Sequence, residues 1–233
     1  MRPAYFIWKG FDSDQMKLWV SQYTDRVRAQ ERISPVTVPG RAGQFHLSEG
    51  TAIYEPITLT MRVQAEIDTA DLETLNEWLS GEGLLVLGYE PNRCYKARII
   101  NEVAFGRRDN CTLEGQIQWQ CEPFKRQYPA EKKIVLSAAG EVENKGTVPA
   151  YPVIKILGSG DIILTVNNEP FTIADVDTSV TLDSQSRIAL DKDGGNCLES
   201  TAGKFPVLQR GANAISWTGT VTSVEITRNQ RWK

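Results

Sequence analysis

The chain has 233 residues, 41% hydrophobic and 24% charged, a composition typical of a globular protein and not of a disordered one. Its 26 basic and 29 acidic side chains give a net charge of -3, and both halves are near balance, which excludes a basic nucleic-acid-binding domain and an acidic tail. No apolar run approaches the roughly 20 residues of a membrane-spanning helix. The N-terminus stops being apolar too early for a signal peptide, so we expect a soluble protein made in the cytoplasm, without membrane association.

Alternation of apolar and polar residues dominates the first half of the chain. A short helix is predicted over residues 14–19, ahead of the strands. The longest alternation runs from Ile57 to Ile67, where every odd-numbered residue is apolar, and it predicts a long, half-buried strand. Residues 95–99 and 112–122 repeat the pattern and predict two further strands of the same sheet.

One helix is predicted with clear ends between these strands, over residues 70–80. Thr69 is a candidate N-cap, and Leu72, Leu75 and Leu79 share one helical face. Gly81 offers the left-handed conformation that often ends a helix.

The pattern changes after Phe124. Residues 126–147 are charged and contain Pro and Gly breakers, which predicts a crossing segment with one strand at 134–136. Seven short strands then follow without a helical pattern, at 153–157, 162–166, 171–173, 180–182, 188–190, 214–216 and 224–226. Such a series predicts a β-sandwich or jelly roll, with a hairpin turn at Asn167-Asn168. We therefore predict a mainly β protein of two domains: residues 1–128, a β-sheet or split-barrel domain with one helix, and residues 129–233, a β-sandwich entered through a crossing segment at 129–149.

Cysteine and histidine usage argues against most catalytic and metal sites. His46 is the only histidine, and the alternation of residues 44–47 predicts that it lies on a strand rather than acts as a catalytic base. The four cysteines are widely spaced and form no C-x-x-C pair, so we expect reduced thiols and no zinc or iron–sulfur site. They are Cys94, Cys111, Cys121 and Cys197.

Three short motifs resemble functional loops and are better explained structurally. Residues 40–43, Gly-Arg-Ala-Gly, lack the Lys-Ser/Thr of a phosphate-binding loop and lead into a strand, so we predict a tight turn. Glu66 and Asp68 share a strand face as glycosidase carboxylates do, but the third acid, Asp71, falls where a helix N-terminus favours a carboxylate. Residues 191–196 begin like a calcium loop without its glycine, which predicts a hairpin turn. We expect no catalytic residues, no cofactor and no metal.

The order of several motifs resembles the distal tail protein (Dit) family of long-tailed, non-contractile bacteriophages and their prophages, over nearly the whole chain. The segments that carry this resemblance are Phe6–Gly10, Val38–Gly43, the strand 57–67, the helix 72–79 with Trp78-Leu79-Ser80-Gly81, residues 85–91, 95–97, 118–124, 144–152 and 158–160. The glycine loop usually carries an acidic residue where this chain has Ala42.

The resemblance implies a structural role in the virion. Members form a homo-hexameric ring at the tail tip from their N-terminal domains. This ring joins the major tail (tube) protein to the tail-associated lysin or hub protein, and leaves a channel through which genomic DNA passes without specific binding. The second domain would be galectin-like and serve as a docking surface. Candidate interface or loop residues are Pro39, Gly40, Arg41, Gly43 and Trp8.

A second function stays open, that of a carbohydrate-binding adhesin module recognising host cell-wall glycans. Sugar-binding sites on β-sandwiches use exposed aromatic rings as stacking platforms, and Trp217 and Trp232 are the candidates in this domain. Core packing is the alternative interpretation for each of them. An enzymatic function is the least supported, because no nucleophile, base and oxyanion site are brought together by the sequence.

Overall fold

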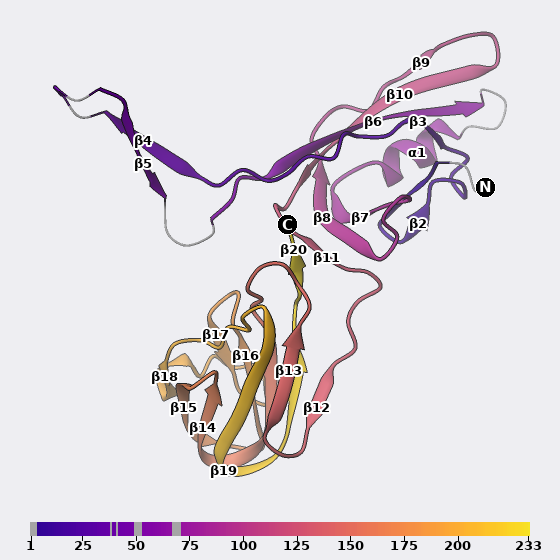
Figure 1. Ribbon diagram of the computed structural model, residues 1–233. Helices are drawn as coiled ribbons and strands as arrows, with labels where there is room; N and C mark the ends of the chain where they lie inside the picture. Colours follow the sequence, from indigo (N-terminus) through magenta and orange to yellow (C-terminus); the bar gives the residue numbers. More distant parts are fainter. Residues whose placement is uncertain (1–3, 38, 41, 49–52, 67–70) are drawn as a thin grey trace. The chain divides into compact units, whose positions relative to one another are not determined.

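The computed structural model describes residues 4–37, 39–40, 42–48, 53–66 and 71–233 (Figure 1). The chain is mainly β and divides into two compact units, residues 1–128 with Lys233, and residues 129–232. Within the described residues, no helix has both the length and the apolar character needed to cross a membrane.

The first unit is built on one antiparallel sheet with the strand order β2-β1-β7-β8-β10-β6-β3, and β9 pairs with β10 while β11 pairs with β8. The strands β6 and β10 pair over ten residues, from Ile57 opposite Cys121 to Glu66 opposite Thr112. The strands of the sheet are β1 (Phe6–Trp8), β2 (Phe11–Asp12), β3 (Trp19–Gln22), β6 (Ile57–Glu66), β7 (Glu82–Leu87), β8 (Arg93–Ile99), β9 (Phe105–Arg107), β10 (Thr112–Cys121) and β11 (Lys125–Gln127).

One face of this sheet, the inner face, carries the core of the first unit. Odd-numbered residues of β6 are buried there, as the alternation predicts, and they pack with aromatic side chains of β1 and β10. Helix α1 (Leu72–Trp78) covers the same core. The indole N–H of Trp8 donates to the carbonyl of Trp78, and the indole of Trp78 donates back to the carbonyl of Trp8, each at 3.0 Å. These reciprocal bonds fix the helix to β1.

Helix α1 is shorter than the predicted 70–80 segment, and it begins with a different cap. Asp71 is the N-cap, and its carboxylate accepts a hydrogen bond from the backbone N–H of Thr74. Thr69 and Ala70, part of the predicted helix start, lie outside the described residues. Gly81 adopts a positive φ of 63° just beyond the helix, as its predicted role as a helix terminator requires.

The predicted helix at residues 14–19 is wrong. Residues 13–17 form a turn, in which the N–H groups of Met16 and Leu18 both donate to the carbonyl of Ser13. Lys17 has a φ of 55°, which an α-helix does not allow, and Trp19 already pairs with Gln64 in β3. Pairing of β3 with β6 therefore outweighs the weak helical pattern.

Between β3 and β6 the chain forms a separate two-stranded sheet, the hairpin. Its strands are β4 (Ile33–Thr37) and β5 (Gln44–Ser48), paired from Ile33 opposite Ser48 to Thr37 opposite Gln44. At its base, the N–H of Arg32 donates to the carbonyl of Ile53 at 2.9 Å. Ile33 and Val36 are 47% and 39% exposed, so the hairpin strand β4 leaves its β-branched side chains in water.

The second unit contains an eight-stranded antiparallel sheet with the central order β12-β19-β14-β15-β18. Its core is a separate cluster of aliphatic residues with Phe171. The strands of the unit are β12 (Ile134–Leu136), β13 (Gly140–Asn144), β14 (Val153–Val166), β15 (Glu169–Val176), β16 (Ser179–Asp183), β17 (Ile188–Leu190), β18 (Thr201–Gly203), β19 (Gly211–Thr227) and β20 (Arg231–Trp232), with a 3-10 turn η1 (Leu198–Ser200).

Two long strands, β14 and β19, replace four of the predicted short ones. The predicted break between 157 and 162 is a bend within β14, where the register with β19 shifts. Gly158 and Gly219 lie at this bend, and a Cβ at either would come within 2.3 Å of a backbone oxygen of the paired strand. Glycine thus allows both strands to bend together without ending. β14 and β19 therefore stay paired on both sides of the bend.

The turns of the second unit follow the sequence closely. Asn167 and Asn168 have φ values of 51° and 68° and connect β14 to β15 as a two-residue hairpin turn, as predicted. The segment that resembles a calcium loop is a turn: the Asp191 carboxylate accepts hydrogen bonds from the backbone N–H groups of Asp193 and Gly195.

Candidate functional site

The hairpin turn holds most of the predicted interface loop. Pro39, Gly40 and Gly43 lie exposed in the connection between β4 and β5, and both glycines have positive φ, at 81° and 86°. A tight turn with left-handed glycines is what the sequence predicts at this loop. Arg41 lies outside the described residues. The interface role of these residues stays a prediction.

Trp8, the remaining predicted interface residue, is placed differently. Its side chain is fully buried in the core of the first unit, between the helix and the sheet. It packs edge-on against Trp119 and is bonded to Trp78. Trp8 therefore has no surface to offer a partner, and its size and reciprocal indole bond explain its place in the core.

The two candidate sugar-stacking tryptophans are not brought together as an open platform. Trp217 lies on β19 opposite Leu164 and packs partly buried against the core of the second unit. Trp232 lies on β20 and is half-buried. Neither side chain lines the hollows described below.

The most distinctive feature of the first unit is an interrupted ladder beside β6. β3 pairs with β6 only from Trp19 opposite Gln64 to Gln22 opposite Arg62. Pairing resumes at the hairpin base, where the N–H of Glu55 donates to the carbonyl of Gln30 at 2.9 Å. Between these points, residues 23–29 run without strand pairing past the first half of β6.

The hydrogen bonds that β10 makes on its far side show which way the backbone groups of β6 point at this break. The N–H of Gln118 donates to the Asn101 side chain, and the Gln118 carbonyl accepts from Ile100, so both groups point away from β6. Thr60 lies opposite Gln118, and directly opposite residues in an antiparallel ladder either exchange bonds or both point outward. The N–H and C=O of Thr60 therefore point toward the break, as do those of Thr58 two residues earlier.

These outward groups form what we call the open edge of β6. Within the described part of the chain, the backbone N–H and C=O groups of Thr58 and Thr60 have no hydrogen-bond partner in the protein. Because Thr58 is exposed and Thr60 partly so, water can satisfy them. The sequence alone could not reveal this edge, since the alternation of β6 is uninterrupted and only the path of residues 23–29 creates it.

Hollows lie on both faces of the sheet at the open edge. The outer hollow, about 290 Å³, is polar and includes Gln22, Thr58, Thr60, Arg62 and Gln116 in its lining. The inner hollow, about 330 Å³, is lined by Leu59 and Tyr95 together with charged side chains. Residues Asp25 and Val27 line both hollows, so the two flank the same break.

The inner hollow carries a set of aromatic rings and cations. The guanidinium of Arg26 lies 5.2 Å from the centre of the Tyr89 ring, and the ammonium of Lys125 lies 5.8 Å from that of Tyr95. Lys125 also pairs with Glu90 at 2.6 Å. Burial raises the pKa of the Tyr95 hydroxyl, which keeps this phenol neutral.

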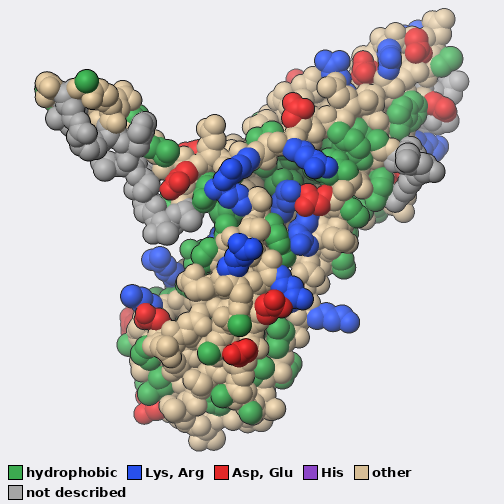
Figure 2. All heavy atoms as spheres, viewed as in Figure 1, with side chains coloured by type: hydrophobic (Ala, Val, Ile, Leu, Met, Phe, Trp, Pro, Cys, Tyr) green, Lys and Arg blue, Asp and Glu red, His purple; other side chains and the backbone are tan. Residues whose placement is uncertain are grey.

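Charges on the outer face of the sheet, opposite the core, are paired rather than gathered. Glu122 receives both Arg126, at 2.8 Å, and Lys96, at 3.6 Å, while Arg98 lies 3.6 Å from Glu82. On the face of the first unit shown in Figure 2, several Lys and Arg side chains lie near one another, with Asp and Glu side chains between and around them.

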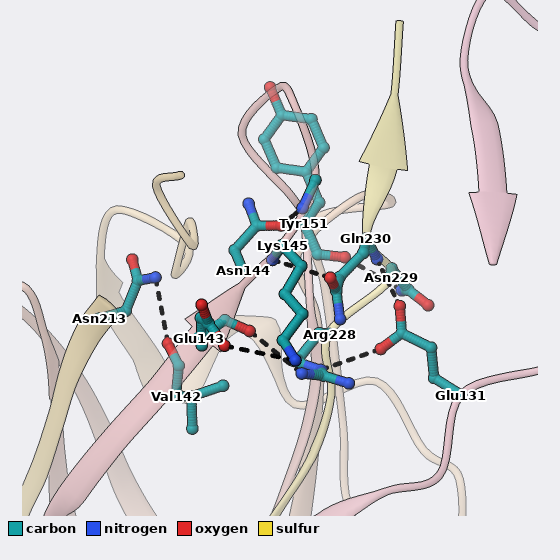
Figure 3. A network of polar contacts seen from close by, with 11 residues as sticks. Glu131, Val142, Glu143, Asn144, Lys145, Tyr151, Asn213, Arg228, Asn229 and Gln230 are labelled. Atoms are coloured by element: carbon teal, nitrogen blue, oxygen red, sulfur yellow. Dashed lines mark hydrogen bonds and ion pairs between the residues drawn. The ribbon is translucent and has the colours of Figure 1, made fainter. Parts of the chain in front are cut away.

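A polar network ties the ends of the second unit together (Figure 3). The Arg228 guanidinium pairs with the Glu131 carboxylate at 3.0 Å, with side chains only 17% and 5% exposed. The other Glu131 oxygen accepts the backbone N–H of Gln230, whose side-chain oxygen accepts the N–H of Lys145. The network therefore joins the start of the unit to the end of β19.

Several acidic and thiol groups that could serve in catalysis have a structural role or are buried. Among the described residues, no group of three or more His, Cys, Asp or Glu side chains is placed to hold a metal ion. Asp71 is occupied as a helix cap, and Asp68 lies outside the described residues. Burial raises the pKa of the Cys121 thiol to about 12 and also raises that of Cys94, which makes both poor nucleophiles.

Comparison with known proteins gives a match in structure and not in sequence. No protein-family model matches the chain, and no curated protein matches it. Among solved structures, the chain is similar to the SPP1 Dit protein (gp 19.1), described as a paradigm of the hub adsorption apparatus in phages that infect Gram-positive bacteria. The similarity covers 100% of both chains with a TM-score of 0.75 and 14% sequence identity.

The chain has the fold of a phage distal tail protein. Full coverage means that both units, and their order along the chain, have counterparts in the SPP1 protein. The mainly β, Dit-like fold expected from the sequence is thereby confirmed; the galectin-like character of the second domain stays a prediction.

Proposed function

We propose that this protein is a structural component of a phage tail tip, a distal tail protein that forms a homo-hexameric ring. In this role it joins the major tail tube protein to the tail-associated lysin or hub protein. The observation that carries the proposal is the fold match to the SPP1 hub protein over the full length of both chains. The protein would be made in the host cytoplasm and would reside at the virion tail tip.

Self-association is supported by surfaces that the isolated chain leaves incomplete. The hairpin exposes Ile33 and Val36, and the open edge of β6 exposes unpaired backbone groups at Thr58 and Thr60. Open edges and uncovered β-branched side chains are features that soluble proteins ordinarily protect, or use for assembly. The exposed turn Pro39–Gly40 and Gly43 belongs to the same hairpin.

A DNA channel is supported by the side chains on the outer face of β10. Three of them, Gln116, Gln118 and Gln120, are uncharged and alternate with core residues along the strand. Each Lys or Arg that contacts a phosphate strengthens DNA binding in a salt-dependent way. The amides of β10 would add no such contact; of the arginines opposite them, Arg98 is paired with Glu82, whereas Arg62 is a candidate phosphate contact.

The second unit would serve as a docking surface of galectin-like type, without turnover of a substrate. Its own ends are closed by the Glu131–Arg228 network, and its candidate stacking residue Trp217 packs against the core. These contacts favour a rigid adaptor over an open sugar-binding module.

Electron microscopy of the purified protein in negative stain tests the proposal. The expected images are rings with sixfold symmetry and a stain-filled central channel. Particles of single-subunit size at every concentration, alone and with the tube protein of the same phage, would contradict it.

A further inference from the structure

We propose that the open edge of β6 is completed by strand β5 of the hairpin from a second copy of this chain. The added strand would hydrogen-bond to Thr58 and Thr60 and fill the break between β6 and residues 23–29. This inference rests on the proposed self-association and names the contact that would produce it.

The open edge offers the backbone groups that strand addition requires. Thr58 and Thr60 together present two N–H and two C=O groups on the same side, spaced as in an antiparallel ladder. An incoming strand would gain up to four backbone hydrogen bonds, which is the binding mode of β-augmentation. β10 already occupies the other side of β6, so only this edge is open.

The two outer edges of the hairpin differ in their ability to pair with another strand. Pro35 lies in β4 within an unbroken ladder to β5, opposite His46. Because proline has no N–H to donate, it fits a strand when its nitrogen faces outward, and the outer edge of β4 therefore lacks a donor at its centre. β5 contains no proline, so its outer edge is the one suited to pairing.

The sequence of β5 alternates, as that of a strand added to a two-faced sheet does. Residues 44–48, Gln-Phe-His-Leu-Ser, alternate polar and apolar residues. A strand laid against β6 places alternate side chains on opposite faces of the sheet. In such a register, positions 45 and 47 would fall on the face of the sheet that carries Leu59, and the polar positions on the face that carries Thr58 and Thr60.

A second copy is the occupant that the chain itself supplies. A two-stranded hairpin has little stability alone in water, and Ile33 and Val36 show that this one leaves apolar area uncovered. Insertion into the edge of the same chain would compete with the bonds at the hairpin base, from Arg32 to Ile53 and from Glu55 to Gln30. A hairpin from another copy reaches the edge with those bonds intact.

Disulfide trapping between two different variants, each with one added cysteine, tests the contact. One protein carries Thr60→Cys and the other carries His46→Cys, both with Cys111→Ser and Cys197→Ser, so that the native thiols left, Cys94 and Cys121, are buried. After mixing and mild oxidation, we expect a covalent dimer on a non-reducing gel, since a disulfide needs Cα atoms about 5.5 Å apart. Mixing excludes a bond within one chain. The matched control pairs Thr60→Cys with Thr37→Cys on β4, where we expect at least tenfold less dimer.

A second measurement separates this contact from ring formation itself. Thr60→Pro removes the outward N–H and leaves the ladder to β10, whereas Thr60→Val keeps that N–H. We expect the Val variant to assemble as the parent does, and the Pro variant to associate at least tenfold more weakly while retaining its near-ultraviolet circular dichroism. Six-subunit assembly by both variants without cross-linking would overturn the β5 contact and leave the ring standing. A parent protein that never associates would overturn both proposals.

Discussion

The two units of the chain differ in how completely their long strands are paired. In the second unit, β14 and β19 bend together at Gly158 and Gly219, so the same two strands serve both halves of the sheet. Its beginning and end are held by the Glu131–Arg228 pair. In the first unit, β6 keeps an open edge at Thr58 and Thr60, and β4 of the hairpin exposes Ile33 and Val36.

This difference suggests that different residues determine the stability of the chain and its association with other copies. The second unit has a buried ion pair and a closed core, whereas the first unit exposes backbone groups to which another strand could hydrogen-bond. We infer that the contacts of the proposed ring lie in the first unit. Changes to cores and networks should therefore alter unfolding, and changes to the hairpin should alter association.

The largest effect on unfolding is expected from Trp8→Ala in the first unit. This change removes a fully buried indole and breaks both bonds with Trp78, and losing a buried aromatic side chain costs about 4 kcal/mol. Denaturant unfolding followed by tryptophan fluorescence measures the loss. Trp8→Phe keeps most of the volume and should cost less than half as much. Equal costs for the two variants would contradict the cavity explanation.

The next effect is expected from Arg228→Met in the second unit. It leaves the Glu131 carboxylate, only 5% exposed, without its partner, and breaking such a pair costs about 3 kcal/mol. Thermal unfolding should show the loss in the second unit alone. The double variant Glu131→Leu with Arg228→Met removes both charges and should recover most of the stability; a double variant no better than the single one would show that the pair itself is not the cause.

A smaller, pH-dependent effect is expected at the thiols of the first unit. Burial raises the pKa of Cys121 from 9.0 to about 12, so the folded state holds the proton that the unfolded state releases. The resulting stability is fully present below pH 9 and is lost as the pH rises toward 12. Denaturant titrations across this range should show a smaller decline for Cys121→Ala. An unchanged decline would assign the pH dependence to other groups.

The smallest effect on unfolding is expected from Ile33→Thr with Val36→Thr in the hairpin. Both side chains are exposed, so we expect stability to change by less than about 0.5 kcal/mol. Association should nevertheless weaken, which sedimentation velocity would detect. The matched control is Val135→Thr on β12, which is 61% exposed and should leave both properties unchanged. An equal loss of association in the control would contradict the assignment of association to the first unit alone.

The sequence predicts the regular elements well and the irregular ones poorly. The alternation of residues 57–66, the turn at Asn167-Asn168 and a helix within residues 70–80 follow local rules and are confirmed by the structure. The bends of β14 and β19 were predicted as chain breaks, because glycine permits both outcomes and only the paired strand decides between them.

The candidate surfaces depended still more on long-range structure. Trp8 was expected at an interface and lies in the core, since nothing in residues 6–10 reveals its bond to Trp78, seventy residues away. The open edge of β6 depends on the path of residues 23–29, which leaves no mark on the pattern of β6 itself. Local patterns therefore indicate which residues form strands, and pairing decides which edges remain free.

The proposed function requires that this chain assemble into a six-subunit ring through its first unit. Light scattering on a sizing column, which gives the absolute mass in solution, tests it most directly. We predict a mass of six subunits of 26.0 kDa, or a multiple of six, for the full chain. A single-subunit mass across the full accessible concentration range would contradict the claim.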